Sequence, residues 1–268
     1  ISMDEDPLKA VRSKKGASIN GCMQLLKEKK VEAVFSAGST GATLISAITI
    51  LGKQRGVIRP AIASVLPTIE RSVILLDSGA SLDVKPKVLY QFAVMGSKLA
   101  EALFDIESPK IGLLNNGEEE SKGRELEKSA FKLLNSSSLN FVGNVEGRDF
   151  ATNKVDVFVT DGFTGNVVLK TLEGTAKLQQ SLISASLKQN LFKPFLPSVK
   201  KALKPVKDQL NPDKTNASYL LGVDGLVTIG HGSSKQEAIM NGIQYTNESI
   251  NKDFIGKFSD AIKELWVI

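Results

Sequence analysis

Four short runs of glycine and small polar residues have the composition of an anion-binding site. Each run directly follows an apolar segment typical of a β-strand, and each leads into a stretch with helical periodicity. Glycine lets a backbone approach a ligand closely, and the free N–H groups of a helix N-terminus attract negative charge. Any tight strand-to-helix turn has similar needs, but four such turns favour a phosphate-type site. The runs are 36–41, 115–118, 160–166 and 230–234.

The candidate ligand-binding residues in these runs are glycines, hydroxyls, amides and one acid. If the preceding segments are parallel strands, their carboxyl ends gather at one edge of a sheet, where α/β proteins bind ligands. We therefore expect them to form a single substrate site. His231 could act there as a base or could be a structural histidine at a strand end. The candidates are Gly38, Ser39, Thr40, Gly41, Asn115, Gly117, Asp161, Gly162, Gly165, His231, Gly232 and Ser233.

Two further side chains are candidates for catalytic roles. Lys122 follows three glutamates just beyond a predicted strand, in a first helical turn where the helix dipole favours acids over a cation. That placement suggests that Lys122 holds an anion bound between the loops. Asn166 opens the next predicted helix, and its side chain either caps that helix or donates a hydrogen bond to a substrate oxygen.

Several other kinds of site are excluded or disfavoured. The runs match neither GxGxxG nor the P-loop, and the sequence has no GxSxG nucleophile motif. The single cysteine, Cys22, permits no disulfide within the chain, and its apolar neighbours indicate a core position in a helix. The single histidine argues against a histidine-built zinc site, so no metal site is predicted.

The net charge of +5 is concentrated in one segment, 186–215. This segment holds seven lysines and two acids, an excess of five that equals the charge of the whole chain. A general nucleic-acid binder needs a broad basic face with arginine or aromatic readers, and 186–215 contains no arginine, tyrosine or tryptophan. We therefore predict no nucleic-acid partner.

The same segment also carries regularly spaced apolar residues. Spacings of mostly three and four, with lysines between them, are typical of an amphipathic helix on an anionic membrane surface. Packing on a sister subunit, or an exposed loop, would also account for the pattern, and prolines divide it into short pieces. The residues expected to form the apolar membrane contact are Leu191, Phe192, Phe195 and Leu196.

The elements that must position these groups alternate between strand and helix. Such alternation predicts an α/β protein with three αβα layers and a mostly parallel sheet, here as one domain over 1–268 with a helical excursion at about 186–215. Predicted strands are 31–35, 61–66, 73–76, 110–114, 141–143, 155–159 and 226–229. Predicted helices are 40–51, 86 to about 103, 124–134, 165–187 and a broken one over 235–265.

Six long motifs occur at these positions: 36–41 (SAGSTG), 75–83 (LLDSGASLD), 110–124 (KIGLLNNGEEESKGR), 140–149 (NFVGNVEGRD), 155–174 (VDVFVTDGFTGNVVLKTLEG) and 220–234 (LLGVDGLVTIGHGSS). They resemble the phosphate acyltransferase family of bacterial phospholipid synthesis (PlsX). Asp77 lies in one of these motifs and joins the expected substrate-binding residues. Members of the family begin with a further N-terminal segment, so the resemblance implies that the chain is part of a longer protein.

The resemblance implies conversion of long-chain acyl-[acyl carrier protein] and inorganic phosphate to acyl phosphate and free carrier protein. It also implies the fold of the isocitrate/isopropylmalate dehydrogenase and phosphate acetyltransferase superfamily, and no metal or organic cofactor. The enzyme would be a cytoplasmic homodimer at the inner face of the cell membrane, where it supplies a glycerol-3-phosphate acyltransferase. Phosphate is largely a dianion near neutral pH and can itself attack a thioester, so such an enzyme needs chiefly an anion cradle and oxyanion donors.

Two other functions stay open at this point. A short-chain phosphotransacylase that uses coenzyme A would need the same anion cradle, and it differs in whether the acyl donor must be protein-bound. A non-enzymatic scaffold at the membrane surface would use 186–215 alone. The scaffold would leave the four glycine-containing runs without a purpose.

The apolar part of the basic segment generates a first testable prediction. Replacing Phe192 and Phe195 with serine should abolish binding to anionic vesicles and leave turnover of soluble substrate largely intact. Lysines near such a surface contribute about 1 kcal/mol each and are screened by salt, so the apolar side chains are needed as well. Vesicle co-sedimentation measures the loss. Dissociation of the variant into monomers would instead identify the segment as a subunit contact.

Overall fold

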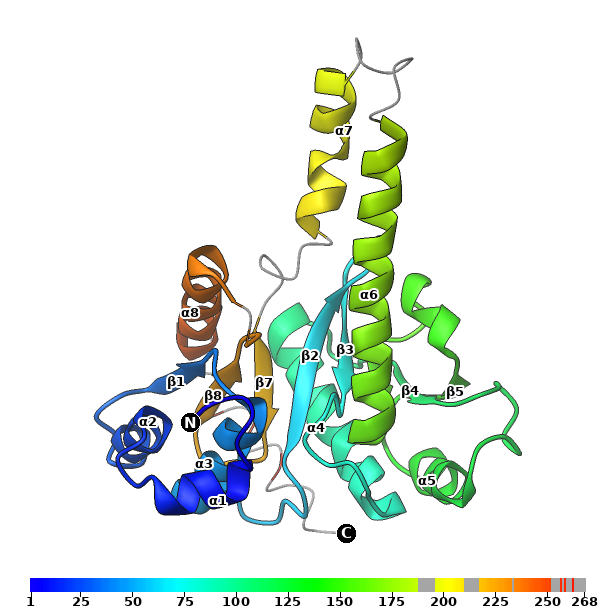
Figure 1. Cartoon of the computed structure of the whole chain (residues 1–268). Coiled ribbons are helices and arrows are strands. Elements are labelled where there is room, and N and C mark those ends of the chain that lie inside the picture. Colours follow the sequence, from blue (N-terminus) through cyan, green and yellow to red (C-terminus); the bar gives the residue numbers. More distant parts are fainter. Residues whose placement is uncertain are drawn as a thin grey trace.

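The computed structural model describes residues 1–187, 196–209, 217–232, 234–251, 256, 258 and 262. The strands in this part of the chain form one sheet in the order β1-β8-β7-β2-β3-β6-β4-β5 (Figure 1). Four of its seven neighbouring pairs are parallel, which confirms the expected mostly parallel sheet. The strands are β1 (Ala33–Ser36), β2 (Ala61–Pro67), β3 (Ser72–Leu76), β4 (Ile111–Leu114), β5 (Phe141–Val145), β6 (Val157–Val159), β7 (Ser218–Leu221) and β8 (Leu226–Ile229).

Three antiparallel pairs at the centre of the sheet divide it into two sets of strands. The pairs β8–β7, β7–β2 and β2–β3 make β1, β8 and β2 run in one direction and the remaining strands in the other. All seven predicted strands are present, whereas β7 was not predicted from the sequence. The expectation that the four glycine-containing turns share one edge is wrong, because β1 and β8 run opposite to β4 and β6.

The two sets of strands are offset, so some of their carboxyl ends nevertheless meet. The last residue of β8, Ile229, pairs with Ser218 at the start of β7. The hydroxyl of Ser64 in β2 lies 2.9 Å from that of Ser218 and 2.7 Å from that of Ser78, which follows β3. The ends of β8 and β3 therefore come together near the middle of β2.

Helices cover both faces of the sheet and form the predicted three layers (Figure 1). One face packs against α4 (Pro86–Phe104), α5 (Glu125–Asn135) and α8 (Gln236–Asn251). The opposite face packs against α2 (Ser18–Lys27), α3 (Thr40–Ile50) and α6 (Gly162–Leu187), and α1 (Pro7–Ser13) contacts α3. A 3-10 helix, η1 (Gly147–Ala151), follows β5, and α7 (Leu196–Gln209) lies beyond the sheet.

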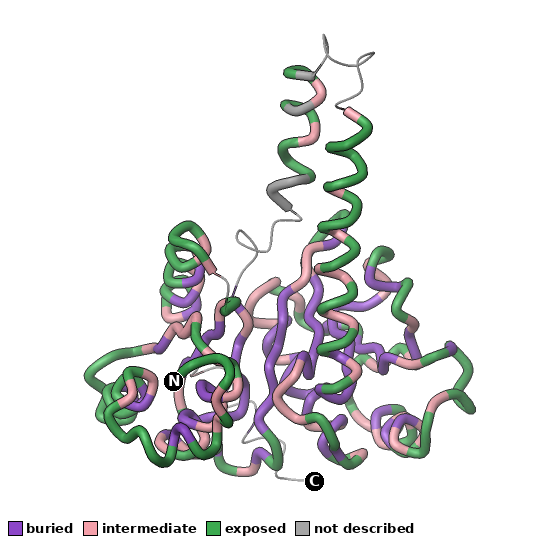
Figure 2. The backbone as a smooth tube through the Cα atoms, viewed as in Figure 1, coloured by how far each residue is buried: buried purple, intermediate pink, exposed green. Residues whose placement is uncertain are grey.

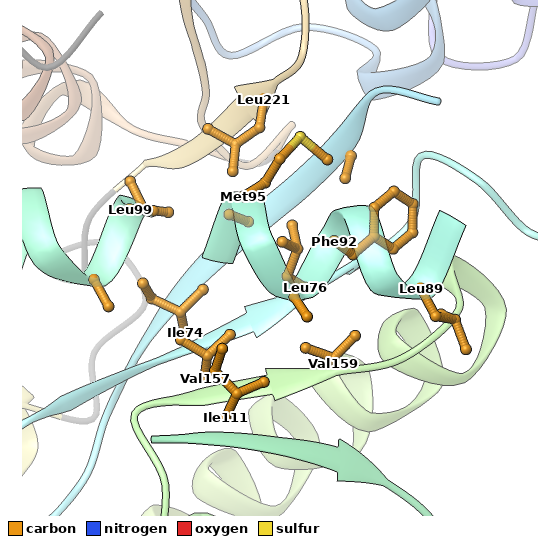
Figure 3. Close-up of a cluster of buried hydrophobic side chains, with 14 of the residues drawn as sticks. Ile74, Leu76, Leu89, Phe92, Met95, Leu99, Ile111, Val157, Val159 and Leu221 are labelled. Atoms are coloured by element: carbon orange, nitrogen blue, oxygen red, sulfur yellow. The ribbon is translucent and has the colours of Figure 1, made fainter. Parts of the chain in front are cut away.

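The core follows the alternation of side chains along the strands. Leu76 points to the α4 side and packs near Phe92, Met95 and Val157 (Figure 3), while Leu75 packs on the α6 side. Figure 2 shows that burial is concentrated in the sheet and in the helix faces against it, whereas the outer part of α6 is exposed.

Cys22 does not have its predicted core position. Its side chain is exposed, because α2 directs Met23 and Leu26 toward the sheet and leaves Cys22 on its outer side. A helix that packs on one face leaves its remaining positions to solvent, even where the local sequence is apolar.

The first turn of α6 packs directly on the loop that follows β3. A Cβ atom at Gly165 would lie 1.9 Å from the backbone oxygen of Asp77, and one at Gly162 would lie 2.7 Å from the Asp77 carboxylate. Glycine is therefore required at both positions for α6 to lie this close to the loop.

This packing predicts opposite effects for two alanine substitutions in α6. Gly165→Ala should lower the free energy of unfolding by about 1–3 kcal/mol, because backbone must move to admit the methyl group. Gly174→Ala is the matched control: nothing lies within 4 Å of its Cβ position, so better helix propensity should raise stability by about 0.5–1 kcal/mol. Urea unfolding measures both. Equal stabilisation by the two substitutions would contradict the close packing of α6.

Candidate functional site

A cavity of about 360 Å³ lies over the centre of the sheet, between α3 and α6. Its lining combines the first turns of α3, the turn after β8, the loop after β3 and one face of α6 with residues of β2, β7 and α8. Three of the four glycine-containing runs, 36–41, 160–166 and 230–234, thus contribute residues to the lining of this cavity. The polar lining residues are Thr40, Ser64, Ser78, Asn166, Lys170, Glu173, Ser218, His231 and Ser234.

Three serines form a hydrogen-bonded chain on the floor of this cavity. Ser78 donates to the backbone oxygen of Ile62 at 3.0 Å, and its Oγ lies 2.7 Å from that of Ser64. Ser64 in turn lies 2.9 Å from Ser218. Ser64 and Ser78 are buried, so their hydroxyls are satisfied within the chain and fix the spacing of β2, β7 and the loop after β3.

Asn166, Lys170 and Glu173 line the α6 wall of the cavity. Their spacing of four and then three residues places them on one face of the helix. Lys170 Nζ lies 2.9 Å from both Glu173 Oε2 and His231 Nε2, and His231 Nε2 lies 3.4 Å from Glu173 Oε1. The structure thus adds a charged pair that sequence reasoning missed, although its spacing from Asn166 was a usable signal.

Glu173 is ionised at neutral pH. The hydrogen bond with His231 is the main cause that lowers the pKa of Glu173 to about 2; partial burial opposes this, and Lys170 supports it. The carboxylate therefore carries a full negative charge beside Lys170.

Asp161, and not Asn166, caps α6. The Asp161 carboxylate accepts hydrogen bonds from the Thr164 backbone N–H at 2.8 Å and from Arg124 at 2.5 Å. Burial raises the pKa of Asp161, but these hydrogen bonds outweigh it and hold the pKa below its usual value. The Asn166 side chain is exposed at the cavity and makes no hydrogen bond within the described residues, so its amide is available to a ligand.

The turn after β4 lies beside a second cavity, of about 540 Å³. Asn115 and Arg124 line it, and the α6 residues Thr164 and Val168 form its other side. Lys122 is exposed and lines neither this cavity nor the first. The structure therefore does not bring Lys122 and Asn166 into one cavity.

The turn around Lys122 is held in a tight conformation. Asn115 Nδ2 donates to the Lys122 backbone oxygen at 3.2 Å. A Cβ atom at Gly117 would lie 2.8 Å from Lys122 Cγ, so glycine at 117 leaves room for the lysine side chain. Asn115 and Gly117 thus shape this turn rather than the first cavity.

Some of the other predicted residues line the first cavity, and others hold the elements around it in place. Thr40, Gly41, His231 and Gly232 line the first cavity, and Ser39 caps α3 by accepting from the Ala42 N–H at 3.3 Å. Gly38 lines neither cavity, and Gly162 and Gly165 are buried against the loop after β3. Ser233 lies outside the described residues.

Asp77 supports the cavity from behind it. Its side chain is fully buried, and its carboxylate accepts four backbone hydrogen bonds, from Ile62, Gly79, Ala80 and Ser81. Burial raises the pKa of Asp77, although these hydrogen bonds oppose the rise. Its contribution is to position Gly79, which lines the cavity opposite Asn166.

The residues predicted to contact a membrane are only partly covered by the structure. Leu191, Phe192 and Phe195 lie outside the described residues, and Leu196 is the first residue of α7. None of the helices in the described ranges combines the length and apolar character needed to cross a bilayer. Within the same ranges, histidine, cysteine and acidic side chains form no group of three that could hold a metal ion.

The free amide of Asn166 predicts a separation of activity from stability. Asn166→Asp should abolish most of the acyl transfer that the family resemblance implies, because a carboxylate would repel an anionic substrate in the cavity. The free energy of unfolding should stay within about 0.5 kcal/mol of the wild-type value, since Asn166 neither caps α6 nor bonds to another described residue. Turnover and urea unfolding measured on the same protein test this. Full activity in the Asp variant would remove Asn166 from the site.

Comparisons with known proteins agree with this architecture. A family model described as "Fatty acid synthesis protein" matches residues 1–257. A phosphate acyltransferase from Elusimicrobium minutum is 43% identical over 272 residues, which cover 98% of this chain and 78% of the relative. A second, from Acidobacterium capsulatum, is 45% identical over 249 residues, covering 92% of this chain and 74% of the relative.

The fold is similar to that of a solved structure. The EutD phosphotransacetylase from Staphylococcus aureus matches with a TM-score of 0.54 at 14% identity, over 97% of this chain and 78% of that one. At such low identity the match shows the fold alone, and it agrees with the α/β fold expected from the sequence. The match to the family model, together with the extended identity to phosphate acyltransferases, confirms the resemblance seen in the motifs: the chain belongs to the fatty acid synthesis protein family that these phosphate acyltransferases represent.

Proposed function

We propose that the chain is a phosphate acyltransferase that converts long-chain acyl-[acyl carrier protein] and inorganic phosphate to acyl phosphate and free carrier protein. The observation that carries this proposal is the identity of 43% to a phosphate acyltransferase over 98% of the chain. The cavity between α3 and α6 supports it, because Asn166, Lys170 and His231 bring an amide, a cation and an imidazole to one polar wall.

The chemistry needs positioning more than a protein nucleophile. An oxygen of hydrogen phosphate attacks the thioester carbonyl carbon, the carbon–sulfur bond breaks, and the proton of hydrogen phosphate ends on the thiol sulfur. A group that holds phosphate near the carbonyl lowers the activation barrier by positioning the two reactants. A hydrogen-bond donor to the developing oxyanion lowers it further. In this proposal the Asn166 amide is that donor.

Lys122 is proposed as a separate anion contact at the turn after β4. Its ammonium has no hydrogen-bond or ion-pair partner in the described part of the chain, and the neighbouring Arg124 is held by Glu127 and Asp161. An exposed lysine without a local partner, next in sequence to Gly123 and Arg124 of the second cavity, is suited to bind an incoming anionic group, either the phosphate or an acidic carrier protein.

Peripheral membrane association and a homodimer belong to the same proposal. The outer part of α6 projects beyond the sheet and exposes Leu178, Leu182 and Ile183, and Val206 is exposed on α7 (Figure 1). Exposed aliphatic side chains on a projecting element favour a partner surface, either a lipid bilayer or a second copy of the chain. A location at the inner face of the cell membrane would deliver the acyl phosphate to a glycerol-3-phosphate acyltransferase.

The direct test is phosphate-dependent release of carrier protein from long-chain acyl-[acyl carrier protein]. We expect release with phosphate, formation of acyl phosphate in equal amount, and no release when sulfate replaces phosphate. Acetyl-coenzyme A serves as the control donor and should react poorly. Faster transfer from acetyl-coenzyme A than from the carrier protein would instead favour a short-chain phosphotransacylase, and absence of any phosphate-dependent transfer would refute the proposed activity.

A further inference from the structure

The charged cluster on α6 has no assigned role in the motifs that identify the family resemblance. Lys170 and Glu173 line the same cavity as Asn166, and His231 meets them from the turn after β8. Among the described residues that line this cavity, Lys170 is the only one with a fixed positive charge, and Glu173 is the only acid. An anion that enters the cavity must therefore obtain its charge compensation chiefly from Lys170.

The floor of the cavity cannot provide that compensation. Ser78 uses its hydroxyl hydrogen on the Ile62 backbone oxygen, so Ser64 must donate to Ser78, and Ser218 must donate to Ser64. A hydroxyl has one hydrogen, and all three are used within this chain of bonds. The half-buried Ser218 hydroxyl at the end of this chain offers lone pairs, which suit the P–OH group of hydrogen phosphate but not its charged oxygens.

Lys170, in contrast, keeps one donor available. Its ammonium has three hydrogens, and its partners at 2.9 Å are Glu173 Oε2 and His231 Nε2. These two contacts use at most two of the three hydrogens, so at least one is left for a ligand. The Lys170 side chain is 51% exposed and lies one helical turn from the unpaired amide of Asn166.

We propose that Lys170 is the residue that binds the phosphate substrate, held in place by Glu173 and His231, with Asn166 one turn away at the reacting carbonyl. This inference rests on the proposed function, since it names the phosphate subsite of that reaction. Glu173 acts as a positioning residue, and its negative charge also limits how tightly the dianion is held. The site would thus bind phosphate moderately and release the charged product.

Titration of the protein with inorganic phosphate by calorimetry tests the assignment. Lys170→Met should raise the dissociation constant for phosphate by about 10- to 100-fold, the range for loss of a charge-assisted hydrogen bond. Lys170→Arg should retain most of the affinity because the charge is kept. Lys177→Met is the matched control: this lysine is exposed on the same helix and lines none of the cavities described, so phosphate affinity should not change.

Glu173→Gln separates direct binding from a merely structural role. If phosphate contacts Lys170, removing the neighbouring negative charge should tighten phosphate binding several-fold, opposite in sign to Lys170→Met. In turnover assays, Lys170→Met should raise the KM for phosphate more than it lowers kcat. If Glu173→Gln instead weakens phosphate binding as much as Lys170→Met does, binding depends only on an intact ion pair. That result would contradict a direct contact between Lys170 and phosphate.

The remaining outcomes distinguish this inference from the proposed function. If Lys170→Met binds phosphate as tightly as the wild type and Lys122→Met does not bind it, the inference is wrong. The proposed acyltransferase activity is not affected by that result. Phosphate binding that depends on Lys170, in a protein without phosphate-dependent acyl transfer, would support the inference and refute the proposed function.

Discussion

The buried carboxylate of Asp77 determines where the candidate site can form. It accepts four backbone hydrogen bonds, one from β2 and three from the loop that follows β3. A carboxylate without solvent must be satisfied by such donors, so the loop has little freedom to move. Gly162 and Gly165 bring α6 onto this loop at distances that no side chain would permit. The α6 face that carries Asn166, Lys170 and Glu173 is thereby fixed above the cavity.

The second constraint is the reversal of strand direction at the centre of the sheet. A fully parallel sheet gathers its ligand-binding turns at one edge. Here the antiparallel strands β7 and β2 separate two parallel groups, and the offset between them brings the end of β8 and the end of β3 to Ser64. The cavity therefore lies over the middle of the sheet. The turn after β4 lies beside a different cavity, on the other side of α6.

Much of the fold was predictable because most of its strands and helices have a clear pattern of apolar residues in the local sequence. Five of the seven predicted strands, β2, β3, β4, β6 and β8, are largely buried apolar runs, and α4 carries its apolar residues at helical spacing. Strand β7 was missed because its four residues carry no clear alternation, and its place between β8 and β2 depends on pairing with segments far away in the chain. Local patterns also misplaced Cys22, since its exposure depends on which face of α2 meets the sheet.

The site was predictable only in part, for the same reason. Thr40, Asn166 and His231 were found from strand-to-helix turns and do line one cavity. Lys122 was grouped with them on the assumption of a single sheet edge. The antiparallel centre separates its turn from those of Thr40 and His231. Asn166 follows β6, a parallel neighbour of β4, but it lines the first cavity, which Lys122 does not. The Lys170–His231 contact joins residues 61 positions apart, so no local pattern could reveal it.

The central claim is that phosphate binds in the cavity between α3 and α6. A crystal structure determined in the presence of inorganic phosphate tests this most directly. The account predicts a tetrahedral ion within hydrogen-bond distance of Lys170 Nζ, close to the Asn166 amide and above the serine floor. Phosphate bound instead at the turn around Lys122, with the cavity between α3 and α6 lacking an ion, would contradict the account.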